Sequence, residues 1–269
     1  MNANVYTKHA PLLSAEHLTL QYGDKTILRD INFCIHDIHR PDVQQGQVVS
    51  LIGRSGIGKT QLFKILSGLI KPTEGVVKID TDQHLVKAGE VGIVPQNYIL
   101  FNHRTIYHNL KIGLDNAAVK LTEEEKKRII EDYAATFQLT EHLKKYPAQI
   151  SGGQRQRVSI IQQVLTGNKF ILLDEPFSGL DILMIDKVIQ LLIKVSTLHE
   201  ENTLIIVSHD IENAAAISDT VWVLGKEEHK EGATIIQEYD LCKMGFAWQP
   251  EIRKEPGFQE LISTIKKQL

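Results

Sequence analysis

The sequence has little cysteine, no long apolar run and no strong charge of either sign. Its two cysteines, Cys34 and Cys242, lie far apart, which excludes a disulfide framework or a cysteine metal cluster and favours a reducing compartment. The longest apolar runs, such as residues 170–173 and 204–207, fall far short of the roughly 20 residues that a membrane-spanning helix needs. Residues 1–9 contain no apolar signal-peptide core. We therefore expect an intracellular protein without a transmembrane segment.

The charge balance excludes another class of partner. The chain has 30 Lys and Arg residues against 33 Asp and Glu residues, a formal net charge of −3. Domains that bind nucleic acids usually carry a strongly basic balance or a basic stripe, so no nucleic-acid partner is predicted. Hydrophobic residues make up 42% and charged residues 23% of the 269 positions, which excludes a disordered chain. That length suits one large domain, or a compact core with an inserted subdomain.

Short apolar segments alternate with segments of helical periodicity along much of the chain. Strands are predicted at residues 48–52, 91–94, 170–173, 204–207 and 220–224, and helices at residues 60–69, 154–165, 182–199 and 211–218. Strands that alternate with crossover helices form a parallel sheet with helices on both faces. The expected fold class is therefore α/β.

The N-terminal part departs from this alternation. Residues 12–21 and 27–34 alternate apolar and polar side chains around the turn sequence Tyr-Gly-Asp-Lys, which predicts an antiparallel hairpin. A further strand is predicted at residues 75–79. The stretch at residues 34–45 is predicted as an unusually long loop before the next strand.

A second departure lies in the middle of the chain. Residues 105–149 have helical character, and Thr122 with Glu125 forms a capping box that opens a helix at residues 123–137. Because this helical stretch interrupts the alternation of strands and helices, we place residues 97–155 as an inserted helical subdomain.

A phosphate-binding loop is the most specific local signal. Residues 53–60, Gly-Arg-Ser-Gly-Ile-Gly-Lys-Thr, match the pattern G-x-x-x-x-G-K-[ST] between a predicted strand and a predicted helix. Its glycines let consecutive backbone N–H groups turn towards phosphates, and the helix N-terminus adds partial positive charge. In this chemistry the lysine reaches the β- and γ-phosphates and the threonine hydroxyl binds Mg²⁺. The predicted nucleotide-binding residues of this loop are Gly53, Arg54, Ser55, Gly56, Ile57, Gly58, Lys59, Thr60 and Gln61.

The strand at residues 170–173 runs into two carboxylates, Asp174 and Glu175. A strand buried on both faces delivers its last residue to the edge of the sheet at which ligands bind. Asp174 could hold Mg²⁺ through a water molecule, and Glu175 could polarise or orient the attacking water. The alternative is a plain turn, because Asp-Glu-Pro is favourable turn chemistry. The phosphate loop favours the functional interpretation.

The run Ser151-Gly152-Gly153-Gln154 opens a predicted helix. Ser151 and Gln154 form a capping box, which leaves the two glycines unexplained. Paired glycines beside a helix N-terminus create an anion-binding nest. Because the chain already has one phosphate loop, this second nest predicts a phosphate that another subunit contributes.

Together these motifs resemble those of the ATP-binding cassette family, the ATP-hydrolysing subunits of ABC transporters. Residues 150–155, Ile-Ser-Gly-Gly-Gln-Arg, are similar to the family signature, with isoleucine where leucine is usual. The other matching segments are the glutamine loop Val94-Pro95-Gln96-Asn97, the D-loop Ser178-Gly179-Leu180-Asp181 and the switch-histidine segment Val207-Ser208-His209-Asp210. The resemblance covers residues 12–225 and implies a RecA-like P-loop NTPase core with an antiparallel β subdomain and an inserted helical subdomain. That leaves residues 226–269 as a tail, in which residues 258–265 have the spacing of an amphipathic helix.

The resemblance implies roles for the matched residues. Taken singly, His209 would be a structural histidine and Tyr22 a hairpin-packing aromatic. In the family pattern, Tyr22 stacks on adenine, Glu175 acts on water, and His209 and Gln96 sense the γ-phosphate. The implied catalytic residues are Glu175, His209 and Gln96, and the implied Mg²⁺ residues are Thr60, Gln96 and Asp174. Two cassettes pair head to tail, so that Ser151, Gly152, Gly153, Gln154 and Asp181 of one chain contact the ATP held by the other.

The resemblance also implies partners. The second ATPase subunit is expected to be an identical chain, and separate transmembrane permease subunits would dock near residues 96–110. The stretch at residues 97–101 would supply apolar surface for them, unless it is ordinary core packing. A substrate-binding protein is a further candidate partner, and the chain would lie on the cytoplasmic face of a bacterial-type cell membrane. The run Gln-Asn-Tyr-Ile-Leu-Phe at residues 96–101 is similar to import cassettes of the nitrate, sulfonate and taurine type.

Two alternatives stay open at this point. One is a non-transport cassette ATPase that acts on ribosomes or DNA, which the single cassette and the missing coiled-coil heptads disfavour. The other is a scaffold protein with an inactive nucleotide site, which the complete set of catalytic motifs disfavours.

Overall fold

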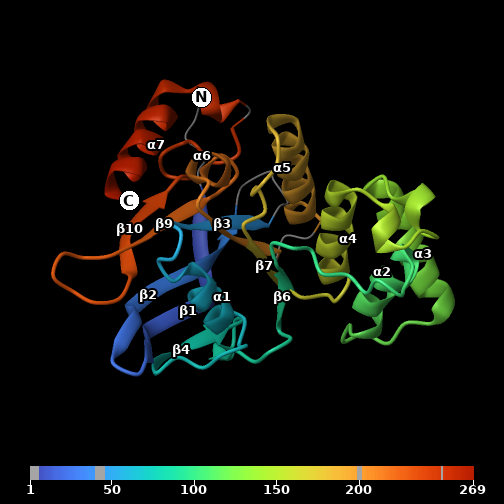
Figure 1. The fold of residues 1–269 in the computed structure, drawn as a ribbon, viewed down its shortest axis with the longest axis horizontal. Helices are drawn as coiled ribbons and strands as arrows, with labels where there is room; N and C mark the ends of the chain where they lie inside the picture. Colours follow the sequence, from blue (N-terminus) through green and yellow to red (C-terminus); the bar gives the residue numbers. More distant parts are fainter. Residues whose placement is uncertain (1–5, 40–45, 199–201, 250) are drawn as a thin grey trace.

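The computed structural model describes residues 6–39, 46–198, 202–249 and 251–269, and these contain two β-sheets (Figure 1). The larger sheet has six strands in the order β10-β9-β3-β8-β7-β6. Its members are β3 (Gln47–Gly53), β6 (Val91–Val94), β7 (Phe170–Asp174), β8 (Thr203–Ser208), β9 (Thr220–Gly225) and β10 (Thr234–Asp240). Neighbouring strands are parallel except β9 and β10, which are antiparallel. The predicted α/β class is therefore confirmed.

Both faces of this sheet are buried, which explains why its strands are continuous apolar runs rather than alternating ones. In β3, Val48 and Ile52 belong to one apolar core, whereas Val49 and Leu51 belong to the other. Helices cover one face, and the smaller sheet with one helix covers the other (Figure 1). These helices are α1 (Lys59–Leu66) beside the smaller sheet, and α4 (Gly152–Val164), α5 (Ile182–Ser196), α6 (Ile211–Ala215) and α7 (Pro256–Gln268) on the opposite face.

The smaller, antiparallel sheet has the strand order β2-β1-β4-β5. Its strands are β1 (Thr7–Tyr22), β2 (Lys25–His39), β4 (Glu74–Ile79) and β5 (His84–Leu85). The predicted hairpin is confirmed: Tyr22 pairs with Lys25, and Gly23 takes the positive φ of 59° that a two-residue turn needs.

The loop predicted at residues 34–45 is wrong for residues 34–39, because β2 continues to His39. The segment of β1 that begins at Thr7 pairs with this extension and satisfies its backbone hydrogen bonds. Residues 40–45 of the predicted loop lie outside the described part of the chain.

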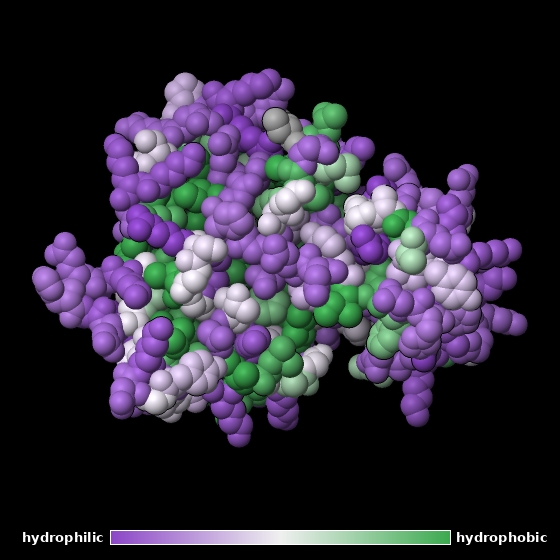
Figure 2. Space-filling model, viewed as in Figure 1, coloured by the Kyte–Doolittle hydropathy of each residue, from purple (hydrophilic) through white to green (hydrophobic). Residues whose placement is uncertain are grey.

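The helical stretch in the middle of the chain contains α2 (Ile106–Asp115), α3 (Glu123–Thr136) and two short 3₁₀ turns, η1 (Thr140–His142) and η2 (Pro147–Gln149). Together with α4 it lies at the right of Figure 1. The predicted capping box is confirmed, since Thr122 Oγ1 accepts from the Glu125 backbone at 3.3 Å and Glu125 Oε2 accepts from the Thr122 backbone at 2.8 Å. Hydrophilic side chains cover most of this stretch in Figure 2.

Several helices are shorter than the periodicity predicted. Helix α1 ends at Leu66 rather than at residue 69, because Gly68 takes a φ of 70° and lies against the backbone of Lys87. Helix α5 ends at Ser196, and position 199, where the prediction ended, lies outside the described residues. Beyond these ends, Ile70 and Leu198 pack against the core without being helical, whereas Leu69 is exposed. The spacing of apolar residues alone therefore placed the boundaries too far along the chain.

The C-terminal part joins the core. Strand β10 adds to the sheet edge beside β9, and the sequence did not predict it. Helix α7 is the predicted amphipathic helix, with Phe258, Leu261, Ile262 and Ile265 buried against the larger core. In the part of the chain that the structure covers, no helix combines the length and apolar character needed to cross a membrane.

A buried carboxylate fastens this C-terminal part to the sheet. Asp219 is fully buried, and its Oδ2 accepts a hydrogen bond from the Val48 backbone at 2.8 Å. Its Oδ1 accepts from the indole N–H of Trp248 at 2.7 Å and from the Cys242 thiol at 3.3 Å. One side chain therefore satisfies donors from the first strand of the parallel sheet and from the C-terminal segment.

We expect Asp219→Ala to lower the free energy of unfolding by at least about 3 kcal/mol, because it leaves buried donors without an acceptor. Urea unfolding followed by circular dichroism measures the change. Asp210→Ala, which removes an equally short acid that is not fully buried, is expected to cost less. A loss below about 0.5 kcal/mol in Asp219→Ala would show that the network does not hold the C-terminal segment.

Candidate active site

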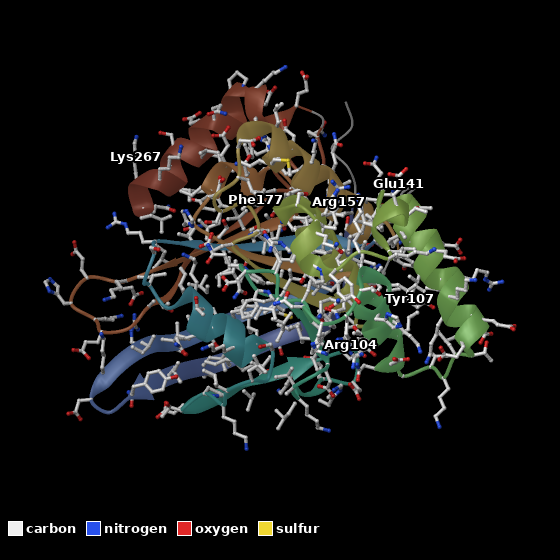
Figure 3. All side chains as sticks on the ribbon, turned by 45° about the vertical axis from the view of Figure 1, so that its right-hand side comes forward. Arg104, Tyr107, Glu141, Arg157, Phe177 and Lys267 are labelled. Atoms are coloured by element: carbon white, nitrogen blue, oxygen red, sulfur yellow. The ribbon has the colours of Figure 1, made fainter. Side chains whose placement is uncertain are left out.

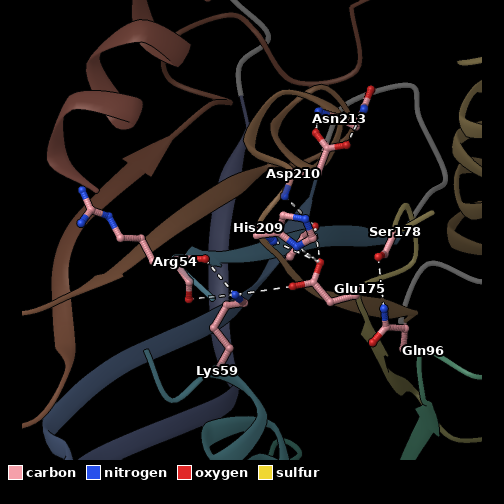
Figure 4. Close-up of polar contacts among 10 residues, drawn as sticks. Arg54, Lys59, Gln96, Glu175, Ser178, His209, Asp210 and Asn213 are labelled. Atoms are coloured by element: carbon pink, nitrogen blue, oxygen red, sulfur yellow. Dashed lines mark hydrogen bonds and ion pairs between the residues drawn. The ribbon is translucent and has the colours of Figure 1, made fainter. Parts of the chain in front are cut away.

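Three adjacent strands bring the predicted site residues to one edge of the sheet. Strands β3, β8 and β7 are parallel neighbours, so their carboxyl ends lie together. Strand β3 ends at Gly53 and opens the phosphate loop, β7 ends at Asp174 just before Glu175, and β8 ends just before His209. Figure 4 shows Lys59, Glu175 and His209 pointing toward one another at this edge. The sequence motifs that define these three ends therefore meet in space.

The phosphate loop has the backbone that an anion cradle requires. Gly56 and Gly58 have φ values of 77° and 117°, which only glycine adopts without strain, and Gly58 caps the N-terminus of α1. Within the described residues, the backbone N–H groups of Gly56, Gly58, Lys59 and Thr60 donate to no protein acceptor. Free N–H groups at a helix N-terminus form a site for phosphate.

The ammonium group of Lys59 is enclosed by this loop. The residue is 6% exposed, and its Nζ donates to the carbonyl oxygens of Gly53 at 2.8 Å and Arg54 at 3.1 Å. Nζ also lies 3.5 Å from Glu175 Oε1. A buried cation in contact with a partly buried carboxylate places complementary charges next to the free N–H groups of the loop.

Glu175 is the residue on which the site converges. Its φ of 50° is unusual for a side chain of this size and marks a backbone position held by its surroundings. Its Oε2 accepts from the His209 backbone at 3.2 Å and lies 2.7 Å from His209 Nδ1, while the carboxylate is only 13% exposed. The His209 side chain is 53% exposed, so the ring contacts Glu175 from the solvent side.

Asp174 is in a different electrostatic environment. Burial, and then the charge of Glu175, raise the pKa of the Asp174 carboxyl, while Lys59 opposes the shift. A raised pKa means that the folded chain holds this proton more tightly than the unfolded chain, so ionised Asp174 lowers stability as the pH rises through the folded-state pKa. The structure gives the Asp174 carboxylate no hydrogen-bond partner among the described side chains.

We therefore expect Asp174→Asn to raise the melting temperature of the nucleotide-free protein at pH 7 by a few degrees. The difference should disappear below the usual carboxyl pKa of 3.8, where the wild-type group is protonated in both states. Thermal unfolding at several pH values measures it. An Asp174→Asn variant that melts below wild type at pH 7 would contradict the electrostatic assignment.

The glutamine loop reaches the segment after Glu175. Gln96 Nε2 donates to Ser178 Oγ at 3.1 Å, which leaves the amide oxygen of Gln96 free (Figure 4). The carbonyl oxygen of Pro176 accepts two hydrogen bonds, from Tyr98 Oη at 3.3 Å and from Gln156 Nε2 at 3.0 Å. The glutamine loop and α4 thus hold the D-loop in place.

Tyr22 lies beside the phosphate-loop helix. The residue is 54% exposed, and its hydroxyl donates to Gln61 Oε1 at 3.1 Å. About half of this residue is therefore open to solvent, and its stacking on adenine stays a prediction.

The serine-glycine-glycine-glutamine run does not join the cluster around Lys59. Ser151 caps α4 in a capping box with Gln154, as the local pattern predicted. A Cβ on Gly152 would meet nothing within 4 Å, and Asp181 caps α5 through the Met184 backbone. No hydrogen bond in the described structure connects these residues to the phosphate loop. That they contact a nucleotide held by another chain stays a prediction.

Three contacts at the site were missed by sequence reasoning. Ser208, Tyr98 and Gln156 each bond to Glu175 or to the residue after it. Ser208 directly precedes the switch histidine, and this position was the one signal that could have identified it. Tyr98 and Gln156 carried no signal, because their role depends on a carbonyl group distant in sequence.

The fold and the site define a P-loop nucleoside triphosphatase. A parallel sheet ends in a glycine loop with a buried lysine, and Glu175, which directly follows β7 at the same edge of the sheet, lies 3.5 Å from that lysine.

Comparisons with known proteins identify the family. A family profile for ABC transporters matches residues 37–178, just over half of the chain. The spermidine/putrescine import ATP-binding protein PotA of Protochlamydia amoebophila (strain UWE25) is 36% identical over 237 residues, which cover 86% of this chain and 60% of PotA. The uncharacterized ABC transporter ATP-binding protein YtlC of Bacillus subtilis (strain 168) is 36% identical over 259 residues, which cover 96% of this chain and 95% of YtlC.

Solved structures agree with these relatives. The cbiO1 protein from Clostridium perfringens, part of the ABC transporter complex cbiONQ, matches with a TM-score of 0.73 and 26% identity, covering 95% of this chain and 100% of cbiO1. A dimeric structure of the ATP-binding cassette MJ0796, bound to ADP and Pi, matches with a TM-score of 0.65 and 25% identity, covering 86% of this chain and 99% of MJ0796. The chain belongs to the ABC transporter family, as one of its ATP-binding and ATP-hydrolysing subunits.

Proposed function

We propose that this chain hydrolyses ATP in a head-to-tail dimer and thereby drives import of a small solute through separate membrane subunits. Residues 12–225 form the ATPase domain, with the helical subdomain inserted at residues 97–155. Residues 226–269 form a C-terminal tail that packs on this domain. The observation that carries the proposal is the contact of Glu175 with both Lys59 and His209 beside a loop of free N–H groups.

Nucleotide binding is assigned to residues 53–61 and Tyr22. The free N–H groups of the loop donate to the phosphates, and Lys59 exchanges its carbonyl partners for phosphate oxygens. The exposed ring of Tyr22 stacks on adenine. Breaking the contact between Lys59 and Glu175 frees the carboxylate oxygen that faced the lysine.

The groups around the loop also fit Mg²⁺. Thr60, Gln96 and Asp174 offer a hydroxyl, an amide oxygen and a carboxylate, and the structure shows the last two without a competing hydrogen bond at those oxygens. Oxygen donors of this kind are the ligands that Mg²⁺ prefers. When bound, Mg²⁺ neutralises negative charge on the phosphates.

Hydrolysis is assigned to Glu175, with His209 and Gln96 as the groups that respond to the γ-phosphate. Glu175 Oε1 orients the attacking water and accepts its proton, because Oε2 is already saturated with hydrogen bonds. The exposed imidazole of His209 can turn from Glu175 to the phosphate without disturbing the core. A movement of Gln96 in response to the γ-phosphate would displace the helical stretch that follows it in the chain.

Dimer formation is inferred from the second glycine nest. Ser151, Gly152, Gly153 and Gln154 of one protomer would close over the nucleotide of its partner, with Asp181 bridging the two. The dimeric MJ0796 cassette bound to ADP and Pi supports pairing of this kind. ATP would hold the dimer closed, and hydrolysis would release it.

Membrane subunits would dock beside the glutamine loop, at residues 96–110. In this stretch Ile99 is 65% exposed and Phe101 is 49% exposed, while Leu100 between them is buried. Core packing therefore accounts for Leu100 but not for its two neighbours. Docking there would hold the chain on the cytoplasmic face of the membrane, and a substrate-binding protein would deliver solute on the other side.

The cassette itself does not select the solute. Relatives of similar identity are named for import of spermidine/putrescine, transport of bicarbonate and import of sulfate/thiosulfate. We propose the same division of labour here: this chain supplies ATP hydrolysis, and the membrane subunits determine the substrate. The resemblance to nitrate, sulfonate and taurine importers is one choice within that range.

Purification of the chain from its native cells in mild detergent tests the proposal. Recovery of two membrane subunits, with ATP hydrolysis that responds to solute and its binding protein, is expected. Recovery of ribosomes or DNA would instead favour the non-transport alternative.

A further inference from the structure

The carboxylate of Glu175 is held by a residue to which the sequence assigned no role, Ser208 at the end of β8. Its side chain is fully buried. Ser208 Oγ lies 3.1 Å from Glu175 Oε2, and the same Oγ accepts a hydrogen bond from the Asp210 backbone at 3.0 Å. A serine hydroxyl has one proton to donate, so the bond from Asp210 directs that proton to Glu175.

The two other donors to Glu175 Oε2 come from His209, and one of them is fixed while the other can move away. The His209 backbone N–H is fixed at the start of the turn after β8, at 3.2 Å. The His209 imidazole, at 2.7 Å, belongs to a side chain that is 53% exposed and is proposed to leave for the γ-phosphate. Once it leaves, Ser208 is the one side chain of the described residues that still donates to this oxygen.

The hydroxyl also connects Glu175 to the helix after the switch histidine. Asp210, which donates to Ser208, caps α6 by accepting from the Asn213 backbone at 3.1 Å and from the Asn213 side chain at 2.7 Å (Figure 4). Ser208 thus shares its two hydrogen bonds between the base and the N-terminus of α6. A shift of either one changes the other.

We propose that Ser208 is a positioning residue for Glu175, which fixes Oε2 so that Oε1 faces the attacking water. This inference rests on the proposed role of Glu175 in hydrolysis. Among the described residues, the Ser208 hydroxyl forms hydrogen bonds with Glu175 and Asp210 and with no residue of the phosphate loop. We therefore expect its substitution to change the hydrolytic step rather than the affinity for ATP.

The test is Ser208→Ala in the full chain, with steady-state phosphate release as the readout. We expect kcat to fall about 10- to 100-fold while KM for ATP stays within about twofold, since one hydrogen bond to a charged group is lost. The matched control is Ser218→Ala. Ser218 is equally buried, but within the described part of the chain its Oγ bonds only to Ser50 Oγ and to the Ala214 carbonyl, so kcat should not change.

Ser208→Thr and Ser208→Val keep the test decisive if the alanine variant is unstable. The two side chains have the same shape, and they differ in the hydroxyl. Any cost of the extra methyl groups in this buried position is therefore common to both. Threonine should restore most of kcat and valine should not. Equal kcat values for the two would overturn the proposal.

Glu175→Gln measured in parallel separates the two possible failures. If Glu175→Gln hydrolyses ATP at nearly the wild-type rate, the proposed function of Glu175 is wrong. If Glu175→Gln is inactive while Ser208→Ala keeps the wild-type kcat, the role of Ser208 alone is wrong. In the double variant, Ser208→Ala should add no further loss to Glu175→Gln, because both act through one carboxylate.

Discussion

Glu175→Gln is expected to bind ATP with nearly wild-type affinity and to hydrolyse it about 10²- to 10³-fold more slowly. Glutamine keeps the shape of the side chain, and its one amide oxygen can still accept hydrogen bonds from His209 and Ser208. Lys59 loses its contact with a carboxylate but keeps its bonds to the carbonyl oxygens of Gly53 and Arg54, so the phosphate loop keeps its shape. It cannot accept a proton from water, and a positioned general base contributes about 10²- to 10⁴-fold. Phosphate release measures hydrolysis, and calorimetric titration with ATP measures binding.

Because hydrolysis is proposed to open the dimer, this variant should also accumulate as an ATP-bound dimer. Size-exclusion chromatography with and without ATP detects it. Glu212→Gln is the matched control: this carboxylate lies on α6, contacts Gln259 and does not reach Lys59 or His209. It should hydrolyse ATP normally. A near-wild-type rate in Glu175→Gln would remove this residue from the mechanism.

Lys59→Met is expected to lower the affinity for ATP about a hundredfold or more. The buried ammonium is the cation that the loop encloses, and methionine fills its space without the charge. Truncating one member of a buried charge pair costs about 2–5 kcal/mol, and about 1.4 kcal/mol corresponds to tenfold in affinity. Lys64→Met, on the same helix α1, should bind ATP like wild type. Equal affinities for the two variants would contradict the assignment of Lys59.

A mixture of variants extends this prediction to the dimer. Gly152→Asp puts a negative charge on the second glycine nest, and the site has room for it because a Cβ meets nothing within 4 Å. Each variant alone should hydrolyse ATP poorly. A mixed dimer of one Gly152→Asp chain and one Lys59→Met chain, obtained by co-expression, should recover activity. One of its two shared sites then has an intact phosphate loop and an intact glycine nest. Continued inactivity of the mixed dimer would contradict the head-to-tail arrangement.

The features that the sequence predicted well are local ones. The apolar runs of β3, β7 and β8, the glycine loop and the capping box at Thr122 each depend on neighbours a few residues away. The parallel order of these strands then forces their carboxyl ends together, so the meeting of Lys59, Glu175 and His209 also followed from motif positions. Local sequence patterns therefore predict this site, because the strands that they define all end at the same edge of the sheet.

The features that the sequence missed depend on partners distant in the chain. Strand β10 is mostly half-buried or exposed and has no clear alternation, so its pairing with β9 decides its structure. The extension of β2 to His39 exists because β1 begins early enough to pair with it. Ser208 looks like an ordinary strand residue until β7 places Glu175 beside it. In each case the deciding contact is tertiary, which local propensity does not encode.

The two hydrogen bonds that the Pro176 carbonyl oxygen accepts affect when hydrolysis can take place. Tyr98 and Gln156 come from the glutamine loop and from α4, and both donate to the residue immediately after Glu175. A rotation of the helical stretch relative to the sheet must either break both bonds or carry Pro176 with it. Proline has a restricted φ, so the displacement is passed along the backbone instead of being absorbed. The position of the proposed base Glu175 is thereby coupled to the part of the chain where membrane subunits are proposed to dock. A solute-loaded permease would in this way determine when ATP is hydrolysed.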